Sequence, residues 1–395
     1  MLARKPLSVL TTALVLSVSV LAACSGERDS LSELEGERTP SVERSVGFDG
    51  NVVRLGVIAD ITGPGGTLDR ARLTGVETYW SDVNTQGGLG GRYVVELDIL
   101  DHRGDPQIAE QAAPGLLEKV VALTFVNETA TGAVHPFLVA EQALGVVPTS
   151  TLDWENDPRF LTHVPPIEAV VLALFENQPS PNWCVITDGS PIGIATRNAS
   201  MRAAEVAQAQ NVTLIEVGED LNSATSAVAC GKVLVEVAGD FQIEAIDSLP
   251  ANREIYVRAG SAAAMGRTDL QFAYLDSGPA WNVDSSEGMR LFLAALLRHA
   301  PDVQPDTRVR DGYVSQIRLH QLLEQAVAEG DLRRPTLFAA SESQAGIDML
   351  GLAEQRLQPR NFNIWFTDNQ GEVSDQRGWQ LERQLATENV DALTN

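Results

Sequence analysis

The feature that most constrains the fold is a repeated alternation of short apolar runs with segments of helical periodicity. The run from Val52 to Ala59 is almost wholly apolar, which is typical of a parallel strand covered on both faces. Leu73, Val76, Trp80 and Val83 then recur at spacings of three and four, which predicts a helix with one apolar face. This first strand and helix therefore predict the opening of a βαβ series.

The alternation continues and then begins a second time. Strands are expected at 93–100, 121–126 and 145–147 and helices at 107–119 and 135–144; the second series has strands at 184–187, 212–217, 233–237 and 255–257, with a helix at 194–210. Helices at 287–300 and 312–329 and a strand at 362–366 follow. Two such series predict an α/β chain with two parallel sheets wrapped by helices.

Size and charge narrow the classes of function. The 395 residues suit two domains, and 53 acidic against 29 basic residues give a formal net charge of −24. This excess of acid argues against nucleic acid as a partner, because a nucleic-acid-binding protein needs a basic surface.

The N-terminus resembles a bacterial lipoprotein signal peptide. Arg4 and Lys5 precede an apolar stretch at 6–20, and Leu-Ala-Ala then leads into Cys24. An ordinary secretory signal fits the first two parts, and a single transmembrane helix is the other alternative. The resemblance implies a signal peptide at 1–23, a lipid anchor on Cys24 and a location on the extracytoplasmic face of the envelope. Residues 24–50 are expected to be a flexible tether.

An ordered series of motifs resembles the branched-chain amino-acid-type substrate-binding proteins of ABC transporters, which have the type I periplasmic-binding fold. The most specific element is Asn-Thr-Gln-Gly-Gly-Leu-Gly-Gly at 84–91. Thr-Gly-Pro at 62–64, Leu-Asp at 100–101, Val-Val-Pro-Thr-Ser-Thr at 146–151 and Thr-Asp-Asn-Gln-Gly at 367–371 accompany it.

This resemblance implies two Rossmann-like lobes that are joined by a three-crossing hinge and close on a ligand. The expected N-terminal lobe comprises 51–163 and 280–374, and the expected C-terminal lobe comprises 164–279 and 375–395. The crossings are expected near 160–166, 274–282 and 372–378.

The resemblance also suggests ligand contacts in the loops that follow the strands. In the first lobe these are Thr62, the loop residues Asn127, Thr129 and Thr131, and the pair Ser150 and Thr151; in the second lobe they are Ile192 and Arg258. Helix capping and a plain turn are the alternatives for the hydroxyl residues. Ile192 and Arg258 stand where the family often has an aromatic residue and an acid. Arg258 therefore indicates either an anionic ligand or a structural ion pair.

Other chemistry finds no support in the sequence. The five histidines lack zinc-type spacing, and no nucleophile elbow, phosphate loop or dinucleotide fingerprint occurs. We therefore expect no metal, no cofactor and no enzymatic activity.

Cys184 and Cys230 form the even pair that remains when Cys24 carries lipid. Both lie near the starts of predicted parallel strands, and an extracytoplasmic compartment preserves disulfides. A disulfide is the prediction, and two buried free thiols are the alternative.

The sequence as a whole predicts a monomeric solute-binding lipoprotein that captures an amino acid or a related amide or carboxylate. Its partners would be the small-molecule solute, ABC permease subunits and, through Cys24, the membrane. The alternative is an envelope lipoprotein that senses a ligand or binds a partner without transport, with a diverged cleft.

Overall fold

The structure is a computed structural model. It describes residues 41–148, 151–178, 180–206, 211–217, 229–237, 245–258, 271–276, 278, 285–343, 348–353, 361–367 and 379–386. The chain divides into a unit at Met1–Thr39 and a unit at Pro40–Asn395. The predicted signal peptide and Cys24 lie outside the described residues. Within the described part, no helix is both long enough and apolar enough to cross a bilayer.

The first sheet has five parallel strands in the order β2-β1-β3-β4-β5. Its strands are β1 (Val52–Ala59), β2 (Val94–Asp101), β3 (Leu123–Phe125), β4 (Gly145–Val146) and β5 (Phe160–Leu161). The strand predicted at 52–59 is confirmed by β1. Because β1 lies between β2 and β3, the loops that follow these three strands meet at one edge of the sheet.

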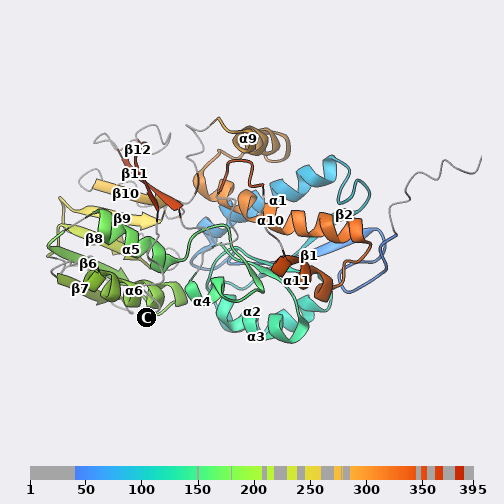
Figure 1. Cartoon of the computed structure of the whole chain (residues 1–395), viewed down its shortest axis with the longest axis horizontal. Coiled ribbons are helices and arrows are strands. Elements are labelled where there is room, and N and C mark those ends of the chain that lie inside the picture. The colour runs from blue at the N-terminus through green and yellow to red at the C-terminus, as the bar shows by residue number, and fades with distance from the viewer. Residues whose placement is uncertain are drawn as a thin grey trace, which may run out of the picture. The chain divides into compact units, whose positions relative to one another are not determined.

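Helices cover both faces of this sheet (Figure 1). They are α1 (Gly66–Thr85), α2 (Pro106–Leu117), α3 (Thr131–Glu141), the short α4 (Leu152–Glu155), α9 (Glu287–His299), α10 (Thr307–Glu329) and α11 (Arg334–Ser343). One apolar core joins the strands to α1, α9, α10 and α11, and a second joins them to α2 and α3. The first core thus combines residues before Leu161 with residues after Met289.

The helices α1 and α10 touch backbone to backbone at two glycines. A Cβ atom added to Gly75 would lie 2.0 Å from the carbonyl oxygen of Val309, and one added to Gly312 would lie 1.9 Å from that of Arg72. Only glycine permits this approach, so the crossing fixes the backbone of Arg72 against α10.

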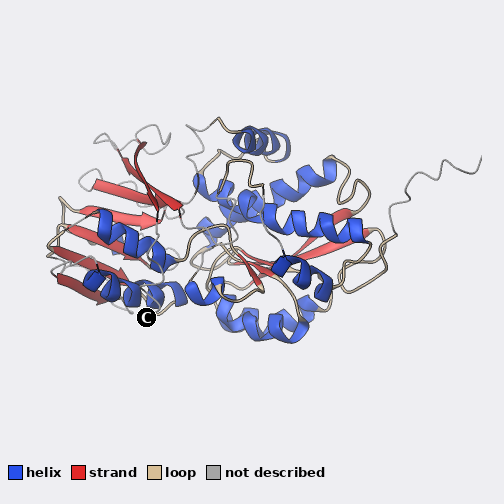
Figure 2. Ribbon diagram, in the orientation of Figure 1, coloured by secondary structure: helices blue, strands red, loops and turns tan. Residues whose placement is uncertain are grey.

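The second sheet has seven strands in the order β12-β11-β10-β9-β8-β6-β7. Its strands are β6 (Asn182–Thr187), β7 (Asn211–Glu216), β8 (Lys232–Glu236), β9 (Glu254–Arg258), β10 (Gln271–Asp276), β11 (Asn361–Thr367) and β12 (Trp379–Ala386). The strands from β6 to β10 are parallel, and this arrangement was predicted for β6, β7, β8 and β9. The strands β11 and β12 add to the β10 edge in antiparallel fashion (Figure 2).

Alternating side chains of this sheet enter two cores. Trp183, Val185 and Tyr256 pack with α5 (Ile167–Asn177) and α6 (Pro191–Val206). Ile186 and Val257 belong to the core on the other face, which also contains the disulfide cysteines.

The predicted disulfide between Cys184 and Cys230 is present. The two Cα atoms lie 5.6 Å apart, which is within bonding reach. The strands β6 and β8 are direct neighbours with Cys184 opposite Val233, so Cys230 lies just before the facing stretch of β8. Both cysteines are at most 5% exposed.

The cores and strand pairings suggest where the lobes divide. The residues Phe362 and Phe366, which the sequence interpretation assigned to the N-terminal lobe at 280–374, belong to β11 in the second sheet. We therefore propose that the first lobe comprises 41–161 and 287–353, and that the second comprises 167–276 and 361–386. Residues 41–50, which were expected to belong to the flexible tether, are assigned to the first lobe because Val42 and Phe48 are buried in its core. On this division the third crossing precedes β11 instead of lying at 372–378.

Candidate functional site

The loop after β1 is built by backbone donors that bind buried carboxylates. Asp60 is 2% exposed, and its two oxygens accept hydrogen bonds from the amides of Gly63 and Gly65, both at 2.6 Å. A Cβ atom on Gly63 would lie 2.2 Å from the carbonyl oxygen of Arg103, so this loop position requires glycine. The carboxylate of Asp60 is thus used to shape the loop.

The predicted site residue Thr62 lies in this loop and is exposed. Its hydroxyl donates to Asp101 Oδ2 at 2.6 Å. Burial alone would raise the pKa of Asp101, but hydrogen bonds from Thr62, Ile61 and Arg103 outweigh it and lower that pKa to about 2. Thr62 therefore fastens the loop after β1 to the end of β2.

Asn127, directly after β3, links three elements. Its Nδ2 donates to Asp69 Oδ2 and lies 3.4 Å from His102 Nε2, while its Oδ1 accepts from the amide of Thr129 at 2.9 Å. Asp69 is 2% exposed and also accepts from the amide of Asp60 at 2.7 Å. Burial raises the pKa of Asp69 to about 7.

The other two predicted residues of this loop are partly or fully enclosed. Thr129 is half-buried, and Thr131, the first residue of α3, is fully buried. Among the described residues, the hydroxyl of Thr131 has no hydrogen-bond partner. A buried hydroxyl without a partner is unusual in a folded protein, so Thr131 is a candidate for contact with a molecule from outside.

The carboxyl ends of β8 and β9 form the edge of the second sheet that faces the loop after β3, and we call these two opposed sides the facing edges. Here Arg258 ends β9 and Glu236 ends the neighbouring strand β8. Arg258 Nε donates to the two oxygens of Glu236 at 2.9 and 2.8 Å, and Nη2 donates to Glu236 Oε1 at 2.5 Å. Glu236 is 2% exposed, and burial raises its pKa despite this partner. Burial lowers the pKa of Arg258, but the charges of Glu236 and Glu128 outweigh it, so that pKa lies above its ordinary value.

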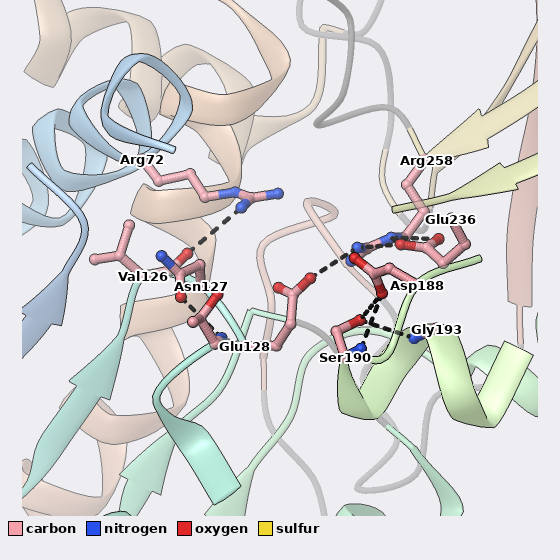
Figure 3. Close-up of polar contacts among 10 residues, drawn as sticks. Arg72, Val126, Asn127, Glu128, Asp188, Ser190, Gly193, Glu236 and Arg258 are labelled. Atoms are coloured by element: carbon pink, nitrogen blue, oxygen red, sulfur yellow. Dashed lines mark hydrogen bonds and ion pairs between the residues drawn. The ribbon is translucent and has the colours of Figure 1, made fainter. Parts of the chain in front are cut away.

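A second carboxylate joins this pair from the first lobe (Figure 3). Glu128, in the loop after β3, accepts from Arg258 Nη2 at 3.2 Å and is 5% exposed. Burial would raise its pKa, but the charges of Arg258 and Arg72 outweigh burial and lower it. An ion pair therefore connects the facing edges of the two sheets.

The start of α6 completes the second-lobe edge. Asp188 Oδ1 accepts from the amide of Ser190 at 3.0 Å and from its hydroxyl at 2.5 Å, and Ser190 Oγ accepts from the amide of Gly193 at 3.0 Å. These bonds satisfy donors at the beginning of a helix.

A pocket of about 600 Å³ opens between α4 and α6. It combines apolar side chains with carboxylates and an arginine; its lining includes Leu152, Asp153, Trp154, Glu168, Ile194 and Arg202. The predicted residue Thr151 also lines it and caps α4 by accepting from the amide of Trp154 at 3.2 Å. Its volume is that of a small-molecule site.

Two predicted residues do not join the polar side chains. Ile192 is 1% exposed and packs in the core between α6 and the second sheet. Ser150 lies outside the described residues.

At least four charged residues of the facing edges were not predicted as site residues: Arg72, Glu128, Asp188 and Glu236. Arg72 was missed because an arginine on an amphipathic helix usually faces solvent. Glu236 carried a signal, since an acid ends the apolar run from Val233 to Val235. Asp188 directly follows β6, where polar residues of parallel sheets converge. Within the described residues, no group of three or more histidine, cysteine or acidic side chains is arranged to hold a metal.

Comparison with known proteins identifies the fold. The family model described as "Periplasmic binding protein" matches residues 52–229, which contain the first sheet, the disulfide-bearing strand β6 and the loop with Asn127 and Glu128. The chain has the type I periplasmic-binding fold. No curated protein sequence matches it.

Solved structures are similar to this binding protein over most of its length. A fatty acid ABC transporter substrate-binding protein from Thermomonospora curvata has a TM-score of 0.76 at 17% identity, with 90% of this chain and 96% of that one covered. A leucine-binding protein from Thermotoga maritima has a TM-score of 0.67 at 17% identity, with coverage of 84% and 98%. At these identities the likeness establishes the fold.

A third structure, an ABC transporter solute-binding protein from R. palustris in complex with benzoate, has a TM-score of 0.67 at 16% identity, with coverage of 85% and 97%. The family and these neighbours are substrate-binding proteins and not enzymes, as the sequence predicted. The family also implies an extracytoplasmic location.

Proposed function

We propose that this binding protein is an extracytoplasmic lipoprotein that captures a small polar solute between its lobes and delivers it to an ABC permease. The observation that carries this proposal is the meeting of polar side chains from the ends of β3, β8 and β9, joined by the Glu128–Arg258 ion pair. Side chains from both lobes contact a ligand together only in a closed form, so a ligand favours closure.

The proposed ligand is an amino acid or a related amide or carboxylate. The enclosed hydroxyl of Thr131 and the amides at the start of α3 suit a carboxylate group. The similar structures come from proteins named for a fatty acid and for leucine and from a complex with benzoate, and all three compounds carry a carboxylate.

A thermal-shift screen of the purified mature chain tests this function. Amino acids, their amides and simple carboxylates would be compared with sugars as an unrelated class. A ligand selective for the native state raises the apparent stability by about 2.7 kcal/mol at a concentration 100 times its Kd. Absence of any shift across the first three classes would contradict the proposal.

Lipid anchoring is tested separately. A fatty-acid label should enter the natural chain and not the Cys24→Ala variant. Equal labelling of both would contradict an anchor on Cys24.

One observation favours the second candidate, a ligand-sensing or partner-binding lipoprotein without transport. Arg258 occupies the position where the family often has an acid, and Glu236 already neutralises much of its charge. Stimulation of a reconstituted permease ATPase by the loaded protein supports transport, whereas solute binding without stimulation supports sensing.

A further inference from the structure

Arg72 is a half-buried arginine with unused hydrogen-bonding capacity. It lies on α1, and its guanidinium points into the space between the facing edges of the two sheets (Figure 3). Its Nη1 donates to the carbonyl oxygen of Val126 at the long distance of 3.5 Å. Its buried Nε has no hydrogen-bond partner among the described residues, where Arg72 also forms no ion pair.

The position of Arg72 is fixed by the fold. The close approach of Gly312 holds the Arg72 backbone against α10, and the Val126 carbonyl lies at the end of the strand that leads to Glu128. A buried donor without a partner costs free energy, and such groups in native proteins call for an explanation. A guanidinium offers a planar fork of donors that matches a carboxylate.

Glu128 is the anion that now lies between the two arginines. Its single hydrogen bond to Arg258 is 3.2 Å long and uses a nitrogen that also binds Glu236 at 2.5 Å. Arg258 therefore keeps a bidentate partner when Glu128 leaves. The charge of Arg72 lowers the pKa of Glu128, although the two groups form no ion pair among the described residues.

We propose that Arg72 is the receptor for a carboxylate group of the ligand and that Glu128 is the internal counter-ion that this carboxylate replaces. The inference rests on the proposed solute-binding function and names its ligand class and specificity residue. The ligand carboxylate takes the open donors of Arg72, while Glu128 turns away from the space between the edges. Binding then selects carboxylates over amides of the same shape.

Isothermal titration calorimetry with matched acids and amides tests this inference. The probes are benzoate with benzamide, octanoate with octanamide, and leucine with leucinamide. The variants are Arg72→Met, Arg72→Lys and Glu128→Gln. Arg54→Met is the control, because Arg54 lies near the other end of β1 and pairs with Asp49 and Glu96. Circular dichroism checks that each variant is folded.

The natural chain should bind at least one acid more tightly than its amide. Arg72→Met should weaken binding of that acid by about 10- to 100-fold and change binding of the amide little, because a hydrogen bond to a charged group contributes that much. Arg72→Lys should bind the acid with an affinity between those of the natural chain and Arg72→Met, because lysine keeps the charge without the planar fork of donors. Glu128→Gln should tighten acid binding, because the competing anion is gone.

Four outcomes would overturn the inference. Equal losses for acid and amide in Arg72→Met would assign Arg72 a structural role, and weaker acid binding by Glu128→Gln would contradict the exchange. Binding of amides but not acids by the natural chain would leave the solute-binding function intact and remove Arg72 as a carboxylate receptor. Failure of every probe to bind would count against the proposed function itself and the inference with it.

Discussion

The facing edges of the two sheets use their charges differently. On the first-lobe edge, Asp60 and Asp101 accept from backbone amides and thereby shape the loops, while Arg72 and Thr131 keep open donors. On the second-lobe edge, the charge of Arg258 is balanced by Glu236 on the neighbouring strand. Under the proposal above, the first lobe recognises the charge of the ligand, and the second lobe contributes an ion pair that is complete within its own sheet.

Among the changes that test this difference between the two edges, replacement of Arg258 by Met should cause the largest loss of stability. Glu236 would remain buried without its partner, and removal of one member of a buried pair costs about 3–5 kcal/mol. Urea unfolding measures the loss. Arg197→Met is the matched control, because its pair with Glu216 is exposed and contributes about 1 kcal/mol or less. Equal small losses in both variants would show that the Arg258 cluster is no more than a surface pair.

The disulfide distinguishes the lobes in a second way, because it closes a loop only in the second lobe. The 46-residue separation of Cys184 and Cys230 predicts a loss of about 2–4 kcal/mol in the double variant Cys184→Ala/Cys230→Ala. Hydrogen exchange should accelerate in β6 and β8 and remain unchanged in β1. A uniform change in both lobes would mean that the two sheets unfold as one unit.

The buried carboxyl group of Asp69, at the first-lobe edge, should make the stability of the protein depend on pH. A carboxyl group whose pKa is raised from 3.8 to about 7 makes the folded state bind more protons than the unfolded state, so its contribution to stability falls as pH rises between these values. Between pH 5.5 and pH 8 this loss is about 2 kcal/mol. The Asp69→Asn variant keeps an oxygen for the amide of Asp60 and should lose this slope. An unchanged pH profile of urea unfolding would contradict the raised pKa.

The smallest expected effect concerns the unused hydroxyl of Thr131. Replacement by Val removes a buried hydroxyl without a partner and should raise stability by about 1 kcal/mol while weakening ligand binding. Thr196 is a matched control in the second lobe, since its hydroxyl is also buried without a partner among the described residues. Thr196→Val should gain stability without affecting the ligand. Unchanged ligand affinity in Thr131→Val would mean that this hydroxyl does not contact the solute.

The sequence predicted helices and strands well where the periodicity or burial of a segment fits only one kind of element. The strand β1 and the helices α9 and α10 agree with their predicted ranges within a few residues. The helix α5 was missed because eight of its 11 residues are buried, so no polar face gives it a helical period. The strands β10 and β12 were missed as well.

Prediction of the site was limited because the order of the strands in each sheet cannot be read from the sequence. Asn127, Thr131 and Arg258 were predicted from the resemblance to the substrate-binding family, and each lies at or near the end of a strand, where loops of parallel sheets converge. Whether Arg258 meets an anionic ligand or an ion-pair partner depended on knowing that β8 and β9 are neighbours, which no local pattern reveals. Prediction of Arg72 as a site residue depended on the packing of α1 against α10, which is a contact between segments more than 200 residues apart.

The first lobe's core has a consequence for the order in which the chain can fold during synthesis. Its strands and α1 are made early, but α9 and α10, which cover the same face, follow only after most of the second lobe. Contacts between segments so distant in sequence form slowly. The faces of β1 and α1 that pack against α9 and α10 therefore stay uncovered until those helices are made, and the incomplete chain is most prone to aggregate just before they emerge.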